Sequence, residues 1–179
     1  MTKQRSLPRG VIAGVAGGLV AAWAMNEFMA GPGQALQQAV SGGGSESQTS
    51  SAKPSNAEPQ DDATMKTADA IVSIATGGRH LTRAQKEKGG PIVHYAFGAI
   101  MGGLYGGLAE YFSGVTSGFG TTFGSALFGG ADMLAVPVLN LSGSGETSAS
   151  SLASPFAAHL VYGVVTESVR RGVRLALSF

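Results

Sequence analysis

The sequence predicts an all-α integral membrane protein that crosses the bilayer four times. Charged residues make up only 13% of the 179 residues, about half the ~25% that is typical of globular domains. The chain contains 28 glycines, which weaken a helix in water but allow close helix contact in a membrane. Apolar runs of ~20 residues, long enough for a ~30 Å hydrocarbon core, alternate with polar or basic segments. These features together predict a four-helix transmembrane bundle packed through Gly-xxx-Gly ridges.

The first predicted span, residues 10–30, follows a basic leader, residues 1–9. Glycines recur at every fourth position on one face of this span: Gly10, Gly14 and Gly18. A cleaved signal peptide is the alternative, because a basic start followed by an apolar run fits both. Asn26 and Glu27 near the end of the run, together with the glycine row, favour a retained helix.

Residues 31–60 form a polar segment rich in glycine, serine and glutamine. Such a composition cannot bury enough apolar surface to offset the entropy that is lost on ordering. We therefore expect a flexible extramembrane segment after the first span.

Residues 61–90 are expected to hold two short helical pieces between the first and second spans. The first piece, 61–76, has its apolar residues on one face and ends at a glycine pair. The second is a basic turn that opens with a capping box of Thr82 and Gln85 and stops at Gly89–Gly90. Two alternatives stay open for this segment: a solvated linker, or an interfacial helix that lies on lipid headgroups.

The second predicted span, residues 91–112, has the most regular pattern. It contains no lysine, arginine or aspartate, and small residues again repeat at intervals of four. The row begins and ends with an ionisable residue: His94, Gly98, Gly102, Gly106 and Glu110. This spacing predicts a transmembrane helix that packs by its glycine face.

Residues 118–141 form the third predicted span, and residues 154–179 the fourth span with its basic C-terminus, joined by a loop at 142–153. Pro137 removes a backbone donor and is expected to kink the third span. Small residues on these two spans extend the packing prediction: Gly120, Gly124 and Gly163. Ser154 followed by Pro155 is a typical helix start.

Ionisable residues in the predicted spans are costly, at roughly 2.5–3.5 kcal/mol each, and so are the candidates for chemistry. They are Glu27, His94, Glu110, Asp132, His159 and Glu167. The structural alternative places Glu27 and Glu110 at headgroup level, gives the histidines hydrogen bonds to neighbouring helices, and pairs Glu167 with Arg170 or Arg171. Spans two and four run in the same direction in an up-down bundle, so His94 and His159 are expected at similar depth.

The functional alternative brings four of these side chains together inside the bundle: His94, Asp132, His159 and Glu167. Such a set could relay protons, because histidine titrates near neutral pH and burial pushes carboxylates toward that range. It could equally bind a divalent metal ion through imidazole and carboxylate. Two histidines at matched depth would also suit a haem, although no cofactor is expected.

The residues from His94 onward resemble the YagU-like family of bacterial inner-membrane proteins of unknown function. The resemblance rests on the row from His94 to Glu110 with Tyr105 and Tyr111, on Gly120, Gly124 and Pro137, and on the ending HLVYGVVTESVRR. It covers mainly residues 91–174. It implies a location in the bacterial inner membrane and supplies no reaction.

We therefore expect a multi-pass inner-membrane protein with both termini in the cytoplasm. The first functional hypothesis is a structural or stress-related component, not an enzyme, that acts by packing with itself or with a partner in a homo-oligomer or larger membrane complex. The alternatives are a proton- or ion-coupled transporter and an intramembrane metal-binding protein. A net charge of +1 argues against a nucleic-acid partner, which would require a basic stripe.

Overall fold

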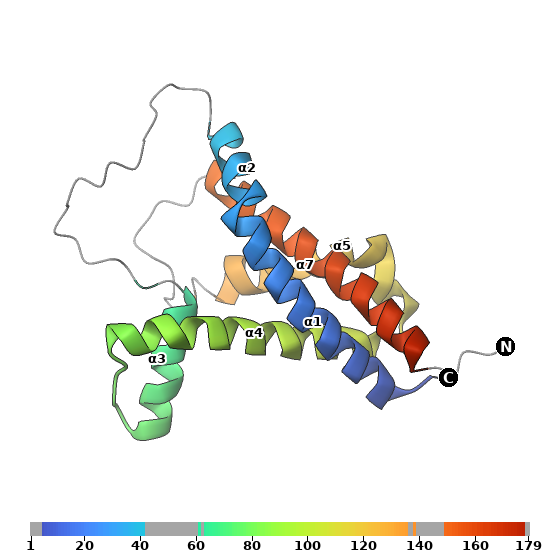
Figure 1. Cartoon of the computed structure of the whole chain (residues 1–179), viewed down its shortest axis with the longest axis horizontal. Helices are drawn as coiled ribbons and strands as arrows, with labels where there is room; N and C mark the ends of the chain where they lie inside the picture. The colour runs from blue at the N-terminus through green and yellow to red at the C-terminus, as the bar shows by residue number, and fades with distance from the viewer. Residues whose placement is uncertain (1–4, 42–60, 62, 136–137, 139–148, 178–179) are drawn as a thin grey trace.

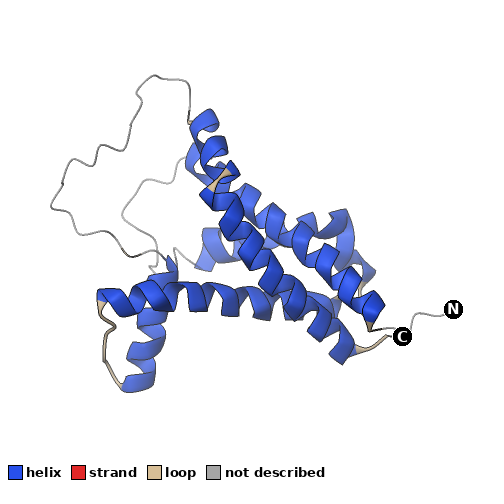
Figure 2. Cartoon of the chain, in the orientation of Figure 1, coloured by secondary structure: helices blue, strands red, loops and turns tan. Residues whose placement is uncertain are grey.

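The computed structural model describes residues 5–41, 61, 63–135, 138 and 149–177, and within these residues every regular element is a helix (Figures 1 and 2). The all-α prediction is therefore confirmed for the described residues. The elements are α1 (Leu7–Ala30), α2 (Pro32–Val40), α3 (Ala63–Thr76), α4 (Arg83–Leu108), the 3₁₀ helix η1 (Ser113–Gly120), α5 (Thr121–Phe128), the π-helical turn η2 (Gly129–Ala135) and α7 (Ala149–Ala176).

Helix α1 is the centre of the bundle and runs antiparallel to both α4 and α7 (Figure 1). The start of α1 lies against the end of α4, where Gly10 meets Glu110. Its far end lies near the start of α7, where Ser154 donates a hydrogen bond to the sulfur of Met29. Helices α4 and α7 consequently run in the same direction, and α5 covers the side of α7 around Gly163.

Only α1 is long and apolar enough, among the helices that the structure describes, to meet a length-and-composition criterion for crossing a membrane. The many glycines of α4 dilute its apolar character. Helix α7 carries Glu167 and several arginines in its C-terminal half. A four-span topology is therefore not established by helix composition.

The prediction of a flexible segment at residues 31–60 is wrong for its first part, because Pro32–Val40 form α2. This helix packs against the start of α7, where Gln37 donates a hydrogen bond to the carbonyl of Ser150 at 3.0 Å. Gly33 lies so close to the hydroxyl of Ser154 that a β-carbon there would stand 2.8 Å from it. Tertiary packing thus orders a sequence whose composition alone predicts no structure. The rest of the predicted segment, from residue 42, lies outside the described residues.

The basic turn expected to stop at Gly89–Gly90 is instead the first part of α4, which continues through both glycines and Pro91. The capping box is present, since the backbone N–H of Thr82 donates to the side-chain oxygen of Gln85 at 2.9 Å. Gly89 and Gly90 face α3 closely, and this contact needs small residues. Helix α4 therefore begins at Arg83, eight residues before the start that the sequence predicts for the second span.

The third predicted span, 118–141, is not one α-helix in its described part. The chain leaves helical geometry at Ser117–Phe119, with Phe119 at a φ of 55°. One short α-helix and one π-helical turn follow. Pro137 lies outside the described residues.

The start predicted for span four at Ser154–Pro155 is also wrong. Helix α7 begins at Ala149, and Pro155 lies inside it. Part of the predicted loop 142–153 is therefore helical.

Candidate functional site

The interior of the bundle combines closely spaced backbones with paired ionised side chains. Glycine and alanine fill the contact between α1 and α4. A cluster of tyrosine, glutamate and arginine fills the end of the bundle where α1 begins and where α4 and α7 end. The two kinds of interior meet at this end of the bundle, because Gly10 contacts both Gly106 and Glu110.

The contact between α1 and α4 is made of backbone against backbone. A β-carbon added at Gly14 would overlap the carbonyl oxygen of Gly102, and one at Gly18 would overlap that of Gly98. Glycines therefore face glycines over three turns, in antiparallel order: Gly10, Gly14 and Gly18 on α1 and Gly106, Gly102 and Gly98 on α4. Such an approach is the usual consequence of small residues at four-residue intervals.

A second close contact joins α5 to α7. A β-carbon at Gly124 would overlap the carbonyl oxygen of His159, and Gly120 and Gly163 meet through their backbones. Gly120 has a φ of 89°, in the left-handed region where a side chain would also be strained. Both the conformation and the contact at this position therefore require glycine.

Glu167 is fully buried and accepts hydrogen bonds from three side chains. The hydroxyl of Tyr105 on α4 donates to Oε2 at 2.8 Å. The guanidinium of Arg170 donates to both oxygens, at 2.7 and 2.9 Å, and Nε of Arg171 donates to Oε1 at 2.6 Å. The carboxylate is thus held by two guanidinium groups of its own helix and by one hydroxyl of a neighbouring helix.

A second ion pair lies one turn further toward the end of the bundle. Arg174 on α7 donates to Oε1 of Glu110 at 2.7 Å and to Oε2 at 3.0 Å. The backbone N–H of Ser6, just before α1, donates to Oε2 of Glu110 at 3.1 Å. One carboxylate therefore connects the start of α1 with the ends of α4 and α7, and it is buried within the chain.

Two polar atoms on the α1-facing side of α7 have no hydrogen-bond partner among the described residues. They are Oγ1 of Thr166 and Nη1 of Arg170, both buried. Buried polar atoms of this kind usually bond to an ordered water. We refer to Tyr105, Glu110, Glu167, Arg170, Arg171 and Arg174 as the ionic cluster.

Asp132 and His159 form a separate pair on the other side of α7. The π-helical turn after α5 brings Oδ2 of Asp132 to 3.4 Å from Nδ1 of His159. The same nitrogen donates to the carbonyl of Pro155 at 3.0 Å. The His159 ring is largely buried and packs edge-on against Phe128. This arrangement fixes the proton on Nδ1 and leaves Nε2 with the lone pair in the neutral ring.

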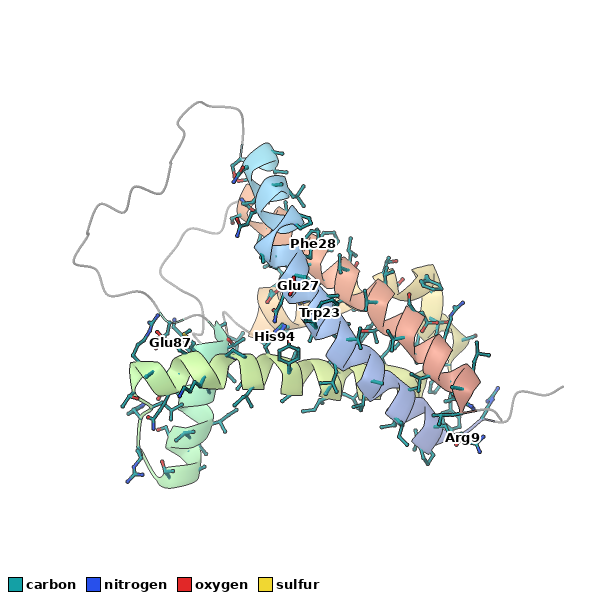
Figure 3. All side chains as sticks on the ribbon, viewed as in Figure 1. Arg9, Trp23, Glu27, Phe28, Glu87 and His94 are labelled. Carbon is teal, nitrogen blue, oxygen red and sulfur yellow. The ribbon has the colours of Figure 1, made fainter. Side chains whose placement is uncertain are left out.

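His94 does not belong to this pair. Its Nε2 lies 3.4 Å from the carbonyl oxygen of Ala22, near the end of α1 that carries the exposed Glu27 (Figure 3). The four-residue convergence of His94, Asp132, His159 and Glu167 is therefore not observed. In the described part of the chain, no group of three or more histidines and carboxylates is close enough to bind a metal ion.

Sequence reasoning missed the partners on α4 and α7 that complete the ionic cluster. The sequence predicts neither Tyr105 nor Arg174 as a partner of the two carboxylates, although Tyr105 is one of the most buried side chains. The spacing of Glu167 from Arg170 and Arg171 predicts their pairing, which is confirmed, but no spacing on one helix indicates the pairing of Arg174 with Glu110. Tyr162, which donates to the carbonyl of Gly98 at 2.6 Å, had no such signal either.

The hairpin of α3 and the first turns of α4 carries a third set of charges, outside the bundle. Lys86 lies 2.8 Å from Asp61 and 3.4 Å from Asp69. The hydrogen bond from Lys86 holds the pKa of Asp61 below its usual value. The backbone N–H of Leu81 and the side chain of His80 lower the pKa of Asp69 in the same way.

Comparisons of the chain with protein-family models, with curated proteins and with solved structures give no match.

Proposed function

We propose that this chain is a multi-span protein of the bacterial inner membrane and that it acts as a structural component by helix packing. The observation that carries the proposal is a distribution of side chains opposite to that of a protein in water, with apolar side chains outside and charged side chains inside. Large apolar side chains of α1 and α4 point outward: Leu7, Val11, Ile12, Leu19, Val20, Trp23, Phe97, Ile100, Leu104 and Leu108. The buried charged side chains are those of Glu110, just after α4, and of Glu167, Arg170 and Arg174 in the C-terminal half of α7.

A lipid environment accounts for both halves of this distribution. Exposed apolar side chains are stabilised by hydrocarbon, and ionisable groups in membrane helices face the bundle interior and pair with one another. Glu167 and Arg170 are buried to 0% and 3% exposure and are bonded to each other. The backbones meet through glycine, which is how helices associate when lipid removes the hydrophobic drive.

The ionic cluster supports a structural role over transport. The carboxylate of Glu167 receives four hydrogen bonds and that of Glu110 at least three. A carboxylate so fully occupied gives up its position only if several bonds break. The cluster therefore stabilises one arrangement of the helices. We infer that the chain acts through its outer surface, by assembly with a partner.

A second copy of the chain is the partner that we propose for this surface. An apolar groove of about 370 Å³ runs between α1 and α4, with walls that include Val11 and Leu104. Gly103 and Gly107 form its floor and allow another helix to approach closely. The groove lies on the side of α4 next to its contact with α1.

Two adjacent glycines give a matched test of this assembly. Gly102 faces the backbone of α1 closely, whereas a β-carbon at Gly103 would meet the side chains of Val15, at 3.0 Å, and of Val11, at 3.7 Å, and would come no nearer than 4.0 Å to the backbone of α1. We expect Gly103→Leu to keep the fold and to lose self-association, measured as the oligomer mass by light scattering in mild detergent. A wild-type protein that is monomeric in detergent and in lipid nanodiscs would overturn the proposal.

A proton path is the second candidate function, and it is favoured by the pair of Asp132 and His159. Their 3.4 Å contact is created by a π-helical turn, an irregularity frequently found at functional sites. If the pair conducts protons, Asp132→Asn abolishes proton flux in liposomes and the exposed Glu27→Gln does not. Equal flux in liposomes with and without protein would exclude this candidate.

The relation to the YagU-like family also remains a proposal. It is supported by the fact that several residues of the resemblance make interhelical contacts: Tyr105, Glu110, Gly120, Gly124 and Glu167. An alignment of homologues in which these positions vary freely would argue against it.

A further inference from the structure

We propose that the outer face of α3 lies on the surface of an anionic lipid bilayer and anchors the α3–α4 hairpin there. The inference rests on the proposed membrane location of the bundle. Helix α3 crosses α4 near the N-terminal end of α4, to one side of the rest of the bundle (Figure 1). Its inner face meets α4 through Ala68, which stands opposite Gly89.

An exposed apolar stripe lies beside the contact with α4 and runs to the outer side of α3, because Ile71 is three residues and Ile74 six residues after Ala68. Ile74 is the most exposed large apolar side chain among the described residues, at 84%, and Ile71 is 54% exposed. With 3.6 residues per turn, the same face also carries Ala63, Thr67 and Ala70 and no charged residue. A helix with two exposed isoleucines and an uncharged face is typical of elements that lie in the membrane interface.

The hydroxyl of Thr67, which lies on this face, is satisfied within the helix itself, because it donates to the carbonyl of Ala63 at 2.7 Å. It therefore does not have to lose a hydrogen bond to water when the helix enters the headgroup layer. Such internal bonding lowers the cost of partial burial in lipid.

The charges of the hairpin indicate the kind of surface. Its described acids are all paired: Asp61 with Arg83 and Lys86, Asp69 with His80 and Lys86, and Glu87 with Arg83. Arg79 and Lys88 make no ion pair with any described residue, and both are exposed. These two exposed cations, Arg79 three residues after α3 and Lys88 in α4, give the hairpin positive charge without an ion pair among the described residues, which matches a surface of anionic phospholipid.

The test measures the depth of single tryptophans in reconstituted full-length protein. The chain contains one tryptophan, Trp23, exposed on α1. In a Trp23→Phe background, Ile74→Trp is compared with Glu87→Trp, a charged position on α4. The vesicles contain phosphatidylcholine and phosphatidylglycerol, with lipids brominated near the headgroup or deep in the chain.

We expect headgroup-proximal bromine to quench Ile74→Trp strongly and Glu87→Trp weakly. Arg79→Gln and Lys88→Gln should each weaken binding of the hairpin to the anionic surface about five-fold. Replacing phosphatidylglycerol by phosphatidylcholine in the vesicles should remove the contribution of both cations. Quenching of Ile74→Trp that is the same with and without phosphatidylglycerol would overturn the assignment of an anionic surface. Equal, weak quenching at both positions would overturn the anchor.

Wild-type Trp23 separates this inference from the proposed function. If Trp23 is quenched by bromine and Ile74→Trp is not, the bundle lies in the bilayer and only the anchor is wrong. If Trp23 is also unquenched, the membrane location itself is wrong.

Discussion

The α1–α4 contact and the ionic cluster both hold the bundle together, but by opposite means. The first contains no side chain beyond hydrogen between Gly14 and Gly102, so its stability depends on shape alone. The second contains two carboxylates paired with three guanidinium groups. The comparison teaches that glycine contacts can set the distance between two helices, whereas ion pairs can set their relative position along the bundle axis.

The two regions respond differently to change. A contact between two backbones cannot accommodate even one added methyl group, because the backbone atoms it would meet cannot move aside. An ion pair tolerates small displacements but not the loss of one partner, since the other charge then stays buried without compensation. Substitutions can therefore distinguish the two kinds of interior, in decreasing order of effect.

The largest effect is expected for Gly102→Leu. A β-carbon at Gly102 would overlap the carbonyl oxygen of Gly14, so the two helices must separate along their whole contact. We expect no folded protein by circular dichroism and size-exclusion chromatography in mild detergent. Leu104→Ala, two residues away and 56% exposed, is the control and should fold normally. Equal tolerance of both changes would contradict the packing described for α1 and α4.

The next effect is expected for Glu167→Gln. The substitution leaves the buried guanidinium of Arg170 without its counter-ion, which typically costs ~3–5 kcal/mol. The free energy of unfolding, measured by titration with a denaturing detergent, should fall by about this amount.

Arg171→Gln is the matched control for that change. Arg171 binds the same carboxylate, but its side chain is 51% exposed, so its loss should cost ~0–1 kcal/mol. Similar losses for the two variants would mean that the cluster is open to water.

A smaller effect is expected for Tyr105→Phe. The change removes one hydrogen bond to a charged acceptor, worth about 1.5–3 kcal/mol, and keeps the stacking of the ring on Phe123. Tyr111→Phe on the exposed surface should leave the free energy of unfolding unchanged. A neutral Tyr105→Phe variant would show that Arg170 and Arg171 suffice to hold Glu167.

Periodicity in the sequence predicts the glycine contact between α1 and α4 better than it predicts the ionic cluster. A helix returns to the same face after about four residues, so the spacing of Gly98, Gly102 and Gly106 identifies a shared face without any knowledge of the partner. Hydropathy likewise marks α1, whose charge-free run is long. The all-helical class follows from these two patterns.

The charged interior is local only in part. The pairing of Glu167 with Arg170 and Arg171 follows from their spacing on one helix and is confirmed, whereas the contacts between helices follow from no local pattern. Glu110 and Arg174 are 64 positions apart in the chain, and their pairing requires the relative register of α4 and α7. The π-helical turn that brings Asp132 to His159 has no sequence signature of its own. Helix α2 forms because α7 offers it a surface, which composition cannot reveal.

The smallest effect is expected in the α3–α4 hairpin, where the ion pairs lie outside the bundle. Asp61 and Asp69 have lowered pKa values in the folded protein. Their stabilisation is therefore complete above the unfolded value of 3.8 and is lost as the pH falls through the lower folded values. Hydrogen exchange of α3 amides should show less protection, after correction for the intrinsic rate, below pH 3.8 than at pH 7.

Asp61→Asn with Asp69→Asn should remove that pH dependence and lower the protection of α3 at pH 7, because Lys86 and the Leu81 N–H then bond to neutral amides. The ionic cluster supplies the contrast, since the protection of α7 amides near Glu167 should stay high in the same double variant. Loss of protection in both helices at once would mean that the hairpin and the bundle unfold as one unit, and the proposed division into a membrane-embedded bundle and a peripheral hairpin would then fail.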